Sequence, residues 1–158
     1  MLYEQTTEKA TIIPHLLSTR NDVALTIVRL ALGGVMFAHG AQKMLGWFGG
    51  PGYSATMTSF TGAGIPAFFA FLAIVAEFFG SLGLILGLLS RVAAFGIACV
   101  MAVAIVKVHS HVGFFMNWTG KQGGEGFEYH ILALAIAVVI MISGAGAWSI
   151  DRMLARRS

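Results

Sequence analysis

Several long apolar stretches of this 158-residue chain are interrupted by side chains that carry charge or exchange protons. Such groups are rare inside a membrane because burying a charge without a partner is costly. Where they occur, they usually face one another and bind, carry or transfer something polar. The ones that stand out are Arg29, His39, Lys43, Glu77, Lys107, His109, His111, Glu128 and His130.

Glu77 is the hardest of these to explain as a solvated group, because it lies about eleven residues inside an apolar run. At a rise of about 1.5 Å per residue, it falls near the middle of a helix that crosses the membrane. On the same scale, Arg29 lies roughly 9 Å inside the preceding run. The axial offset between them is then also about 9 Å, which two extended side chains can bridge. We therefore predict a buried Arg29–Glu77 ion pair.

A second group of polar side chains is expected toward one end of the runs. His39 and Lys43 are four residues apart near the end of the first run, and Lys107 and His111 repeat this spacing near the end of the third. His130 lies at the start of the fourth run. Because residues i and i+4 are neighbours on a helix, this pattern predicts a polar site shared by three helices in the outer third of the membrane.

The same side chains also have simpler structural interpretations. Lys43 and Lys107 could only extend to the lipid headgroups, and Glu128 could be a solvated group at the interface. His109 and His111 are two positions apart and point to nearly opposite sides of a helix, so at most one of them joins the site. We prefer His111 because it shares the face of Lys107.

Several ligand classes suit such a group of residues. Histidines can bind zinc, copper or iron, but no tight metal-ligand spacing such as HExxH is present, so no metal site is predicted. Haem would need two histidines at equal depth on facing helices, as His39 with His111 or His130, and is not favoured. A quinone head group fits better, because it needs hydrogen-bond donors and a proton-exchanging group in an apolar, lipid-accessible cavity. A proton relay or transport pathway would use the same residues.

The elements that must position these residues are membrane-spanning helices. The chain is 57% hydrophobic and 11% charged, with a mean hydropathy of +0.80, whereas a soluble domain is about a quarter charged. This composition excludes an ordinary soluble domain and intrinsic disorder, and a lone cysteine, Cys99, excludes an internal disulfide framework. Four apolar runs are long enough to cross a bilayer core of about 30 Å. They cover residues 23–45, 66–89, 92–112 and 127–147.

The distribution of Lys and Arg predicts the orientation of these spans. Most basic residues fall near the two termini or in the turn after the second run, and that side is expected to be cytoplasmic. We predict an all-α, antiparallel four-helix bundle in the inner (cytoplasmic) membrane, with both termini in the cytoplasm. Residues 1–22 are expected to form a lead-in that lies partly on the membrane surface, followed by one transmembrane domain over residues 23–158. The net charge of +3 then reflects topology and gives no reason to expect nucleic-acid binding.

Glycines recur at spacings that place them along one side of a helix. Gly33 and Gly40 are seven residues apart on the first run, and Gly80, Gly83 and Gly87 follow a similar pattern on the second. Small residues let membrane helices approach closely. These stripes predict tight helix–helix contacts, within the chain or between copies of a homo-oligomer.

Several segments together resemble a known family. They read Arg29-Leu-Ala-Leu-Gly-Gly34, His39-Gly-Ala-Gln-Lys43, Glu77-Phe-Phe-Gly-Ser-Leu-Gly83 and Gly144-Ala-Gly-Ala-Trp-Ser-Ile-Asp151. Over residues 23–154 the chain resembles the DoxX family of small bacterial and archaeal four-span membrane proteins. The resemblance implies a four-helix bundle linked to respiratory redox chemistry. Members are associated with quinone-linked oxidation of sulfur compounds, with quinol oxidase complexes and with oxidative-stress or quinone-detoxification systems.

We therefore predict a membrane subunit or small redox protein that binds lipid-borne quinone and works with redox partner proteins. His39, Lys43 and Glu77 are assigned the proton-exchanging role. The full predicted binding site consists of Arg29, His39, Lys43, Glu77, Lys107, His111 and His130. Two alternatives remain: a non-catalytic scaffold that assembles partner enzymes, and a transporter for protons or a small solute.

Overall fold

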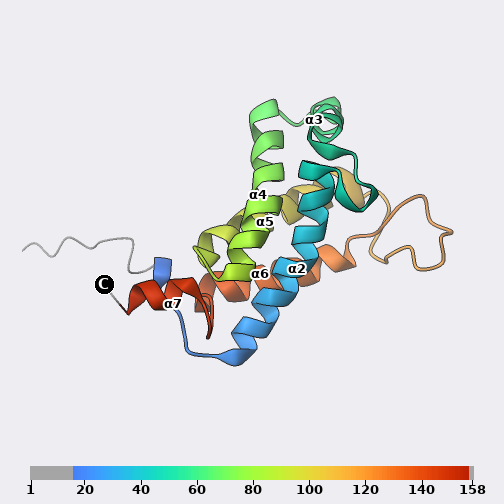
Figure 1. Ribbon diagram of the computed structural model, residues 1–158. Coiled ribbons are helices and arrows are strands. Elements are labelled where there is room, and N and C mark those ends of the chain that lie inside the picture. The colour runs from blue at the N-terminus through green and yellow to red at the C-terminus, as the bar shows by residue number, and fades with distance from the viewer. Residues whose placement is uncertain (1–15, 157–158) are drawn as a thin grey trace, which may run out of the picture.

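The computed structural model describes residues 16–156, and every regular element in this range is helical (Figure 1). The long helices are α2 (Val23–Leu45), α4 (Ala67–Leu86), α5 (Ser90–Ala104) and α6 (Glu128–Ser143). Shorter elements connect or follow them: η1 (Trp47–Gly49), α3 (Gly52–Gly62), η2 (Ile105–His109) and α7 (Ile150–Ala155). The prediction of an all-α fold is confirmed for this range. The expected surface segment falls mostly on residues 1–15, which lie outside the described residues.

Both ends of α2 are fixed by local sequence signals. The carboxylate of Asp22 accepts a hydrogen bond from the amide of Ala24 at 2.7 Å, which satisfies one of the free N–H groups of the first turn. Gly46 follows the helix with a φ of +73°, a left-handed conformation that glycine adopts without strain. The bounds of α2 therefore coincide with the predicted run, residues 23–45.

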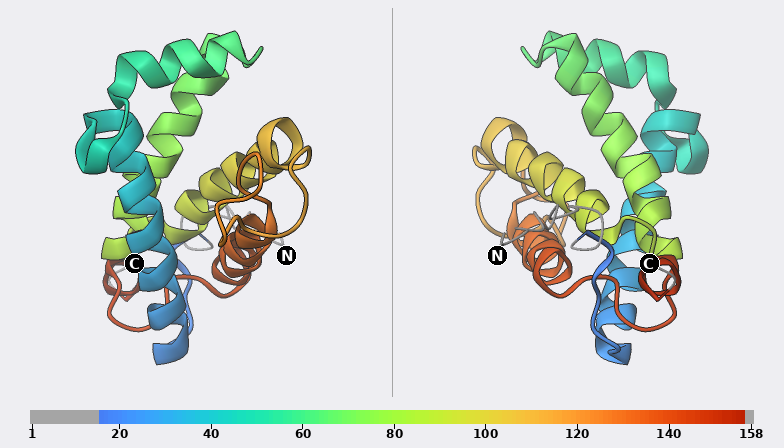
Figure 2. Two further views of the ribbon diagram at one scale, coloured as in Figure 1. Left: turned by 90° about the vertical axis from the view of Figure 1, so that its right-hand side faces the viewer. Right: turned by 90° about the vertical axis from the view of Figure 1, so that its left-hand side faces the viewer.

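The four long helices form two pairs. Helix α2 packs along α4, and α5 packs along α6, while the short turn Gly87–Leu89 joins α4 to α5. The α5–α6 pair is inclined to the α2–α4 pair, and the two pairs diverge away from this turn (Figure 2). The helices thus do not lie side by side along their whole lengths, as a compact bundle would require. Where they converge, the apolar core comprises Leu32, Met36, Leu84, Ala94, Ile97, Met101, Ala133, Ala137 and Ile140.

Gly33 and Gly40 form close contacts between α2 and α4, as their spacing predicts. A Cβ on Gly40 would lie 2.7 Å from backbone atoms of Glu77 and Phe78, so α2 and α4 touch there backbone to backbone. On the other side of α4, a Cβ on Gly83 would lie 3.0 Å from the carbonyl oxygen of Leu88. Gly87 instead ends α4 in a left-handed conformation, with φ of +67°.

Helix α6 is shorter than the predicted run of residues 127–147. It ends at Ser143, because Gly144 and Gly146 take φ values of +84° and +81° and turn the chain away from the helix. A Cβ on Gly144 would lie 2.6 Å from the carbonyl oxygen of Ser18, so this segment packs directly on the chain that enters α2. With sixteen residues, α6 is about 24 Å long.

Helix α3 was not predicted, since residues 46–66 are rich in glycine and proline. It begins at Gly52 and ends at Gly62, and it contacts both α2 and α4. The buried hydroxyl of Thr56 donates a hydrogen bond to the carbonyl oxygen of Gly52 at 2.7 Å. This long connection is therefore an ordered part of the fold.

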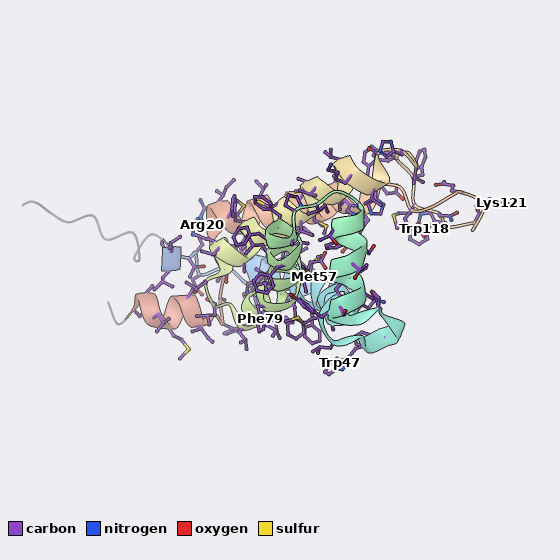
Figure 3. All side chains as sticks on the ribbon, turned by 90° about the horizontal axis from the view of Figure 1, so that it is seen from above. Arg20, Trp47, Met57, Phe79, Trp118 and Lys121 are labelled. Atoms are coloured by element: carbon purple, nitrogen blue, oxygen red, sulfur yellow. The ribbon has the colours of Figure 1, made fainter. Side chains whose placement is uncertain are left out.

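The outer surface of the helices is apolar, as expected for contact with lipid. Three helical segments, Val23–Leu45, Ala67–Leu86 and Ser90–His109, are long and apolar enough to cross a membrane. Large side chains such as Phe68 and Ile142 are about two-thirds exposed. Figure 3 shows Trp118 and Lys121 on the loop that projects beyond the helices, away from Trp47 on η1.

Candidate functional site

A buried ion pair joins α2 to α4. The ammonium Nζ of Lys43 lies 2.5 Å from Oε2 of Glu77, and the Glu77 side chain is only 4% exposed. Gly40 lies directly opposite Glu77, so the close approach of the two backbones brings Lys43, one turn later, within reach of the carboxylate. A charge buried in an apolar environment needs such a partner, and removing either one is strongly destabilising. Lys43 is therefore not simply extended to the headgroups.

The predicted Arg29–Glu77 ion pair is wrong. Arg29 is 1% exposed, and its guanidinium donates to the carbonyl oxygens of Leu84, Ile85 and Ala145. Glu77 precedes Ile85 by eight residues, about 12 Å along α4, which places its carboxylate beyond the reach of Arg29. The predicted axial distance between Arg29 and Glu77 assumed that α2 and α4 begin and end at the same level. In the structure the two helices are shifted relative to each other along their axes.

Two aromatic rings extend the site from α2 to α6. The His39 ring lies 6.1 Å from the ring of Tyr129, centroid to centroid. The Tyr129 hydroxyl donates to the sulfur of the buried Met36 at 3.5 Å. His39 itself is exposed on the surface of the chain, whereas Tyr129 is half-buried. Tyr129 was not among the predicted site residues; its position next to His130 is the sequence signal that could have indicated it.

Two histidines complete the site at the far end of the α5–α6 pair. The rings of His109 and His130 are 4.1 Å apart. Nδ1 of His109 lies 2.7 Å from the carbonyl oxygen of Glu125, and since a carbonyl only accepts, Nδ1 carries the proton. Nδ1 of His130 is buried and has no hydrogen-bond partner within the described residues. Buried polar atoms are nearly always paired, so an unpaired one needs an explanation.

The preference for His111 over His109 is wrong. Residues Ile105–His109 form a π-helical turn, in which the amide of Ser110 donates to the carbonyl of Ile105 at 2.8 Å. This wider turn changes the phase of the helix and directs His109 toward α6. Lys107 and His111 are exposed, and the structure does not bring them to the site.

Glu128 is also separate from these residues. Its Oε1 accepts hydrogen bonds from the amide of Met116 at 2.9 Å and from the indole N–H of Trp118 at 3.3 Å. These hydrogen bonds stabilise the loop before α6. Glu128 therefore lies outside the site, as in the alternative interpretation given from the sequence.

We call the six residues brought together by α2, α4, η2 and α6 the polar cluster. Its members are linked by the Lys43–Glu77 ion pair and by ring contacts of His39 with Tyr129, of Tyr129 with His130, and of His130 with His109. Within the described residues, no three or more His, Cys, Asp or Glu side chains are arranged to hold a metal ion. The polar cluster comprises His39, Lys43, Glu77, His109, Tyr129 and His130.

Charged side chains near the turn between α4 and α5 bond to backbone atoms at helix ends and, within the described residues, not to other side chains. The buried carboxylate of Asp151 accepts the amides of Leu89 and Ser90 at 2.7 and 2.9 Å, which caps the start of α5. Arg29 caps the carbonyls at the end of α4, and Arg91 donates to the carbonyls of Met141 and Ile142 at the end of α6. These groups satisfy backbone atoms that helix ends leave free. Their role is architectural.

The apolar helices and the polar cluster between them define a small helical membrane protein. The DoxX family model matches residues 24–110, more than half of the chain, and the chain belongs to the DoxX family. The resemblance stated from the sequence is thereby confirmed.

Two relatives are similar over most of their lengths. The chain is 34% identical over 152 residues to "Uncharacterized membrane protein Rv3486" of Mycobacterium tuberculosis (strain ATCC 25618 / H37Rv), covering 92% of this chain and 90% of the relative. It is 29% identical over 136 residues to "Inner membrane protein YqjF" of Escherichia coli (strain K12), covering 86% and 95%. No solved structure matches the chain.

Proposed function

We propose that this DoxX-family membrane protein binds a quinone-type head group at the polar cluster and takes part in quinone-linked redox chemistry. A partner protein supplies or accepts the electrons, and the polar cluster exchanges the protons. In this proposal α2, α4, α5 and α6 cross the inner membrane and both termini lie in the cytoplasm, as the distribution of Lys and Arg predicts. The related protein named as an inner membrane protein supports that location.

The observation that carries the proposal is the unpartnered, buried Nδ1 of His130. Beside it lie the half-buried His109 and Tyr129, while His39 is exposed at the edge of the cluster. A quinone carries two carbonyl oxygens that accept hydrogen bonds on an otherwise apolar ring. His130 and His39 offer donors on α6 and α2, at the place where the two helix pairs separate. A ligand that arrives through the lipid would reach His39 first.

The polar cluster also has the means to exchange protons. Oxidation of a quinol to a quinone releases two protons and two electrons, and reduction takes them up. An imidazole ring carries one donor and one acceptor nitrogen, so it can take up a proton on one side and release one on the other. The Lys43–Glu77 ion pair adds a carboxylate inside the protein, 2.5 Å from the ammonium group.

Quinone affinity tests the proposal directly. The purified protein in lipid nanodiscs is titrated with a short-chain ubiquinone and with a menaquinone, and dissociation constants are measured for the wild type and three variants. His130→Ala and His39→Ala each remove one donor, worth about 1 kcal/mol, so each weakens binding roughly five- to tenfold. His111→Ala is the matched control, because His111 is exposed outside the cluster. Absence of binding to either quinone, or equal affinity in all variants, contradicts the proposal.

One observation favours a second candidate, a pathway for protons. Ring contacts connect His109, at the loop, through His130 and Tyr129 to His39 on α2, which also carries Lys43, the partner of the buried Glu77. Such a series is also what a proton conductor requires. Proton flux into proteoliposomes, abolished by Glu77→Gln and independent of added quinone, would favour this function over quinone chemistry.

A further inference from the structure

A hollow of about 580 Å³ lies beside α7, at the opposite side of the molecule's core from the polar cluster. Its wall includes Leu86 from the end of α4, Trp148 and Met153. These side chains are 52%, 78% and 59% exposed, so the wall is apolar and open to the surroundings of the protein. Exposed tryptophan next to the end of a membrane helix is typical of the lipid–water interface.

Two arginines form the charged side of this hollow. Arg152 and Arg156 both line it, four residues apart along α7 and its C-cap. Like charges at this spacing repel each other unless an anion lies between them. Neither guanidinium donates a hydrogen bond or forms an ion pair within the described residues. The neighbouring carboxylate of Asp151 is turned inward, where both of its oxygens accept amides at the start of α5.

The other hollow at this end of the molecule provides a contrast. It measures about 340 Å³ and is lined by Arg91 with Val92, Phe95 and other apolar residues. The Arg91 guanidinium is occupied, because it donates to the carbonyl oxygens of Ser18, Met141 and Ile142. Of these two hollows, the one beside α7 combines an apolar wall with guanidinium groups that lack a partner among residues 16–156.

We propose that this hollow binds the headgroup of an anionic phospholipid. The phosphate would lie between Arg152 and Arg156, whose planar groups bind phosphate oxygens in pairs. The acyl chains would run along Leu86 and the exposed face of α4. Basic pockets at the membrane boundary of helical proteins bind such headgroups, and a volume of several hundred Å³ is suitable for a ligand of this size. This proposal is independent of the quinone site.

Native mass spectrometry of the full chain in detergent tests it. The protein is mixed with equal amounts of phosphatidylglycerol and phosphatidylcholine, and the ratio of the two lipid adducts is measured. We expect a preference for phosphatidylglycerol in the wild type that falls about fivefold in Arg152→Gln and in Arg156→Gln, since one basic residue near a membrane surface contributes about 1 kcal/mol. Lys121→Gln removes one positive charge from the exposed loop and should leave the ratio unchanged.

Three outcomes overturn the proposal. One is equal binding of the two lipids by the wild type, and another is an unchanged ratio in both arginine variants. The third is displacement of phosphatidylglycerol by millimolar inorganic phosphate, which would show that the site takes free phosphate and not a lipid. The thermal stability of each variant, measured in detergent, checks that the fold is retained; Arg156 is exposed, so Arg156→Gln tests the idea even if Arg152→Gln unfolds.

Discussion

Replacing Gly40 with alanine is the most direct test of how the ion pair is positioned. The added Cβ would lie 2.7 Å from the backbone of Glu77 and Phe78, about 0.7 Å inside the shortest ordinary contact of 3.4 Å. The atoms it meets belong to a helix backbone, so no side chain can move aside and α2 must separate from α4. Because Lys43 and Glu77 extend from the same contact, the separation also lengthens their 2.5 Å ion pair.

The expected change in the free energy of unfolding is the balance of two opposing effects. Overpacking a close contact costs about 1–3 kcal/mol, and a clash with backbone belongs at the upper end of that range. Alanine in a helix interior is favoured over glycine by about 1 kcal/mol. Gly40→Ala should therefore lower the free energy of unfolding by about 2 kcal/mol. Gly34→Ala is the matched control, since a Cβ there has no heavy atom within 4 Å, and it should be neutral or stabilising.

The measurement is the free energy of unfolding in mixed micelles, from a reversible titration with denaturing detergent, together with quinone affinity. The two variants change the same residue type on the same helix, so differences in helix propensity cancel. If Gly40→Ala is as stable as Gly34→Ala, α2 and α4 do not touch at Gly40 and the argument for the position of Lys43 fails. If Gly40→Ala is destabilised yet binds quinone like the wild type, the ion pair is structural only.

Three further predictions concern individual side chains. Asp151→Asn removes the charged acceptor of both amides at the start of α5 and leaves one of them facing an N–H₂ donor, so it should cost about 1–2 kcal/mol in the same unfolding titration; an unchanged value would contradict the capping role. Arg29→Lys keeps the charge but cannot reach three carbonyls at once, and should cost about 2 kcal/mol, with no rescue by raised salt because the site is buried. His109→Ala should weaken quinone binding about fivefold, whereas His111→Ala should not; the reverse result would show that the π-helical turn does not direct His109 to the site.

The ends of a helix could be predicted from the sequence where local capping residues end it. They could not be predicted where contacts with a distant part of the chain end it. The bounds of α2 coincide with the apolar run because Asp22 and Gly46 cap it. The last run continues in hydropathy through Ala147, yet α6 ends at Ser143. Its true end depends on Gly144, which packs against a segment more than a hundred residues earlier in the chain. No pattern within the run itself contains that information.

In the candidate site, too, part of the arrangement could be predicted from residue type and part depended on how the helices pack. Residue type marked Lys43 and Glu77 as buried polar side chains that need partners, and they form an ion pair with each other. The choice of partner was wrong for Glu77, since it depended on the axial offset of two helices. The relevant signal was Gly40, which marks a level at which the backbones of α2 and α4 touch.

The choice between His109 and His111 could not be made from spacing, because it rests on one wider helical turn. A regular α-helix repeats every 3.6 residues, so positions 107 and 111 share a face. The π-helical turn at Ile105–His109 adds a residue to one turn and changes this assignment. Nothing in the local composition, which is a mixture of β-branched and basic residues, indicates where such a turn falls.

The buried charged groups at the helix ends and those in the polar cluster have different kinds of hydrogen-bond and ion-pair partners. This difference distinguishes residues that stabilise the fold from residues that could bind a ligand. Arg29 and Asp151 bond to backbone carbonyls and amides at helix ends, which are fixed partners that no ligand can replace. In the polar cluster, by contrast, most contacts join one side chain to another, and one buried atom, Nδ1 of His130, has no partner within the described residues. Side-chain partners can change protonation and can be exchanged for a ligand, whereas backbone caps cannot. A substitution at Asp151 should therefore alter stability without altering any pH dependence of ligand binding, and a substitution at His130 should do the opposite.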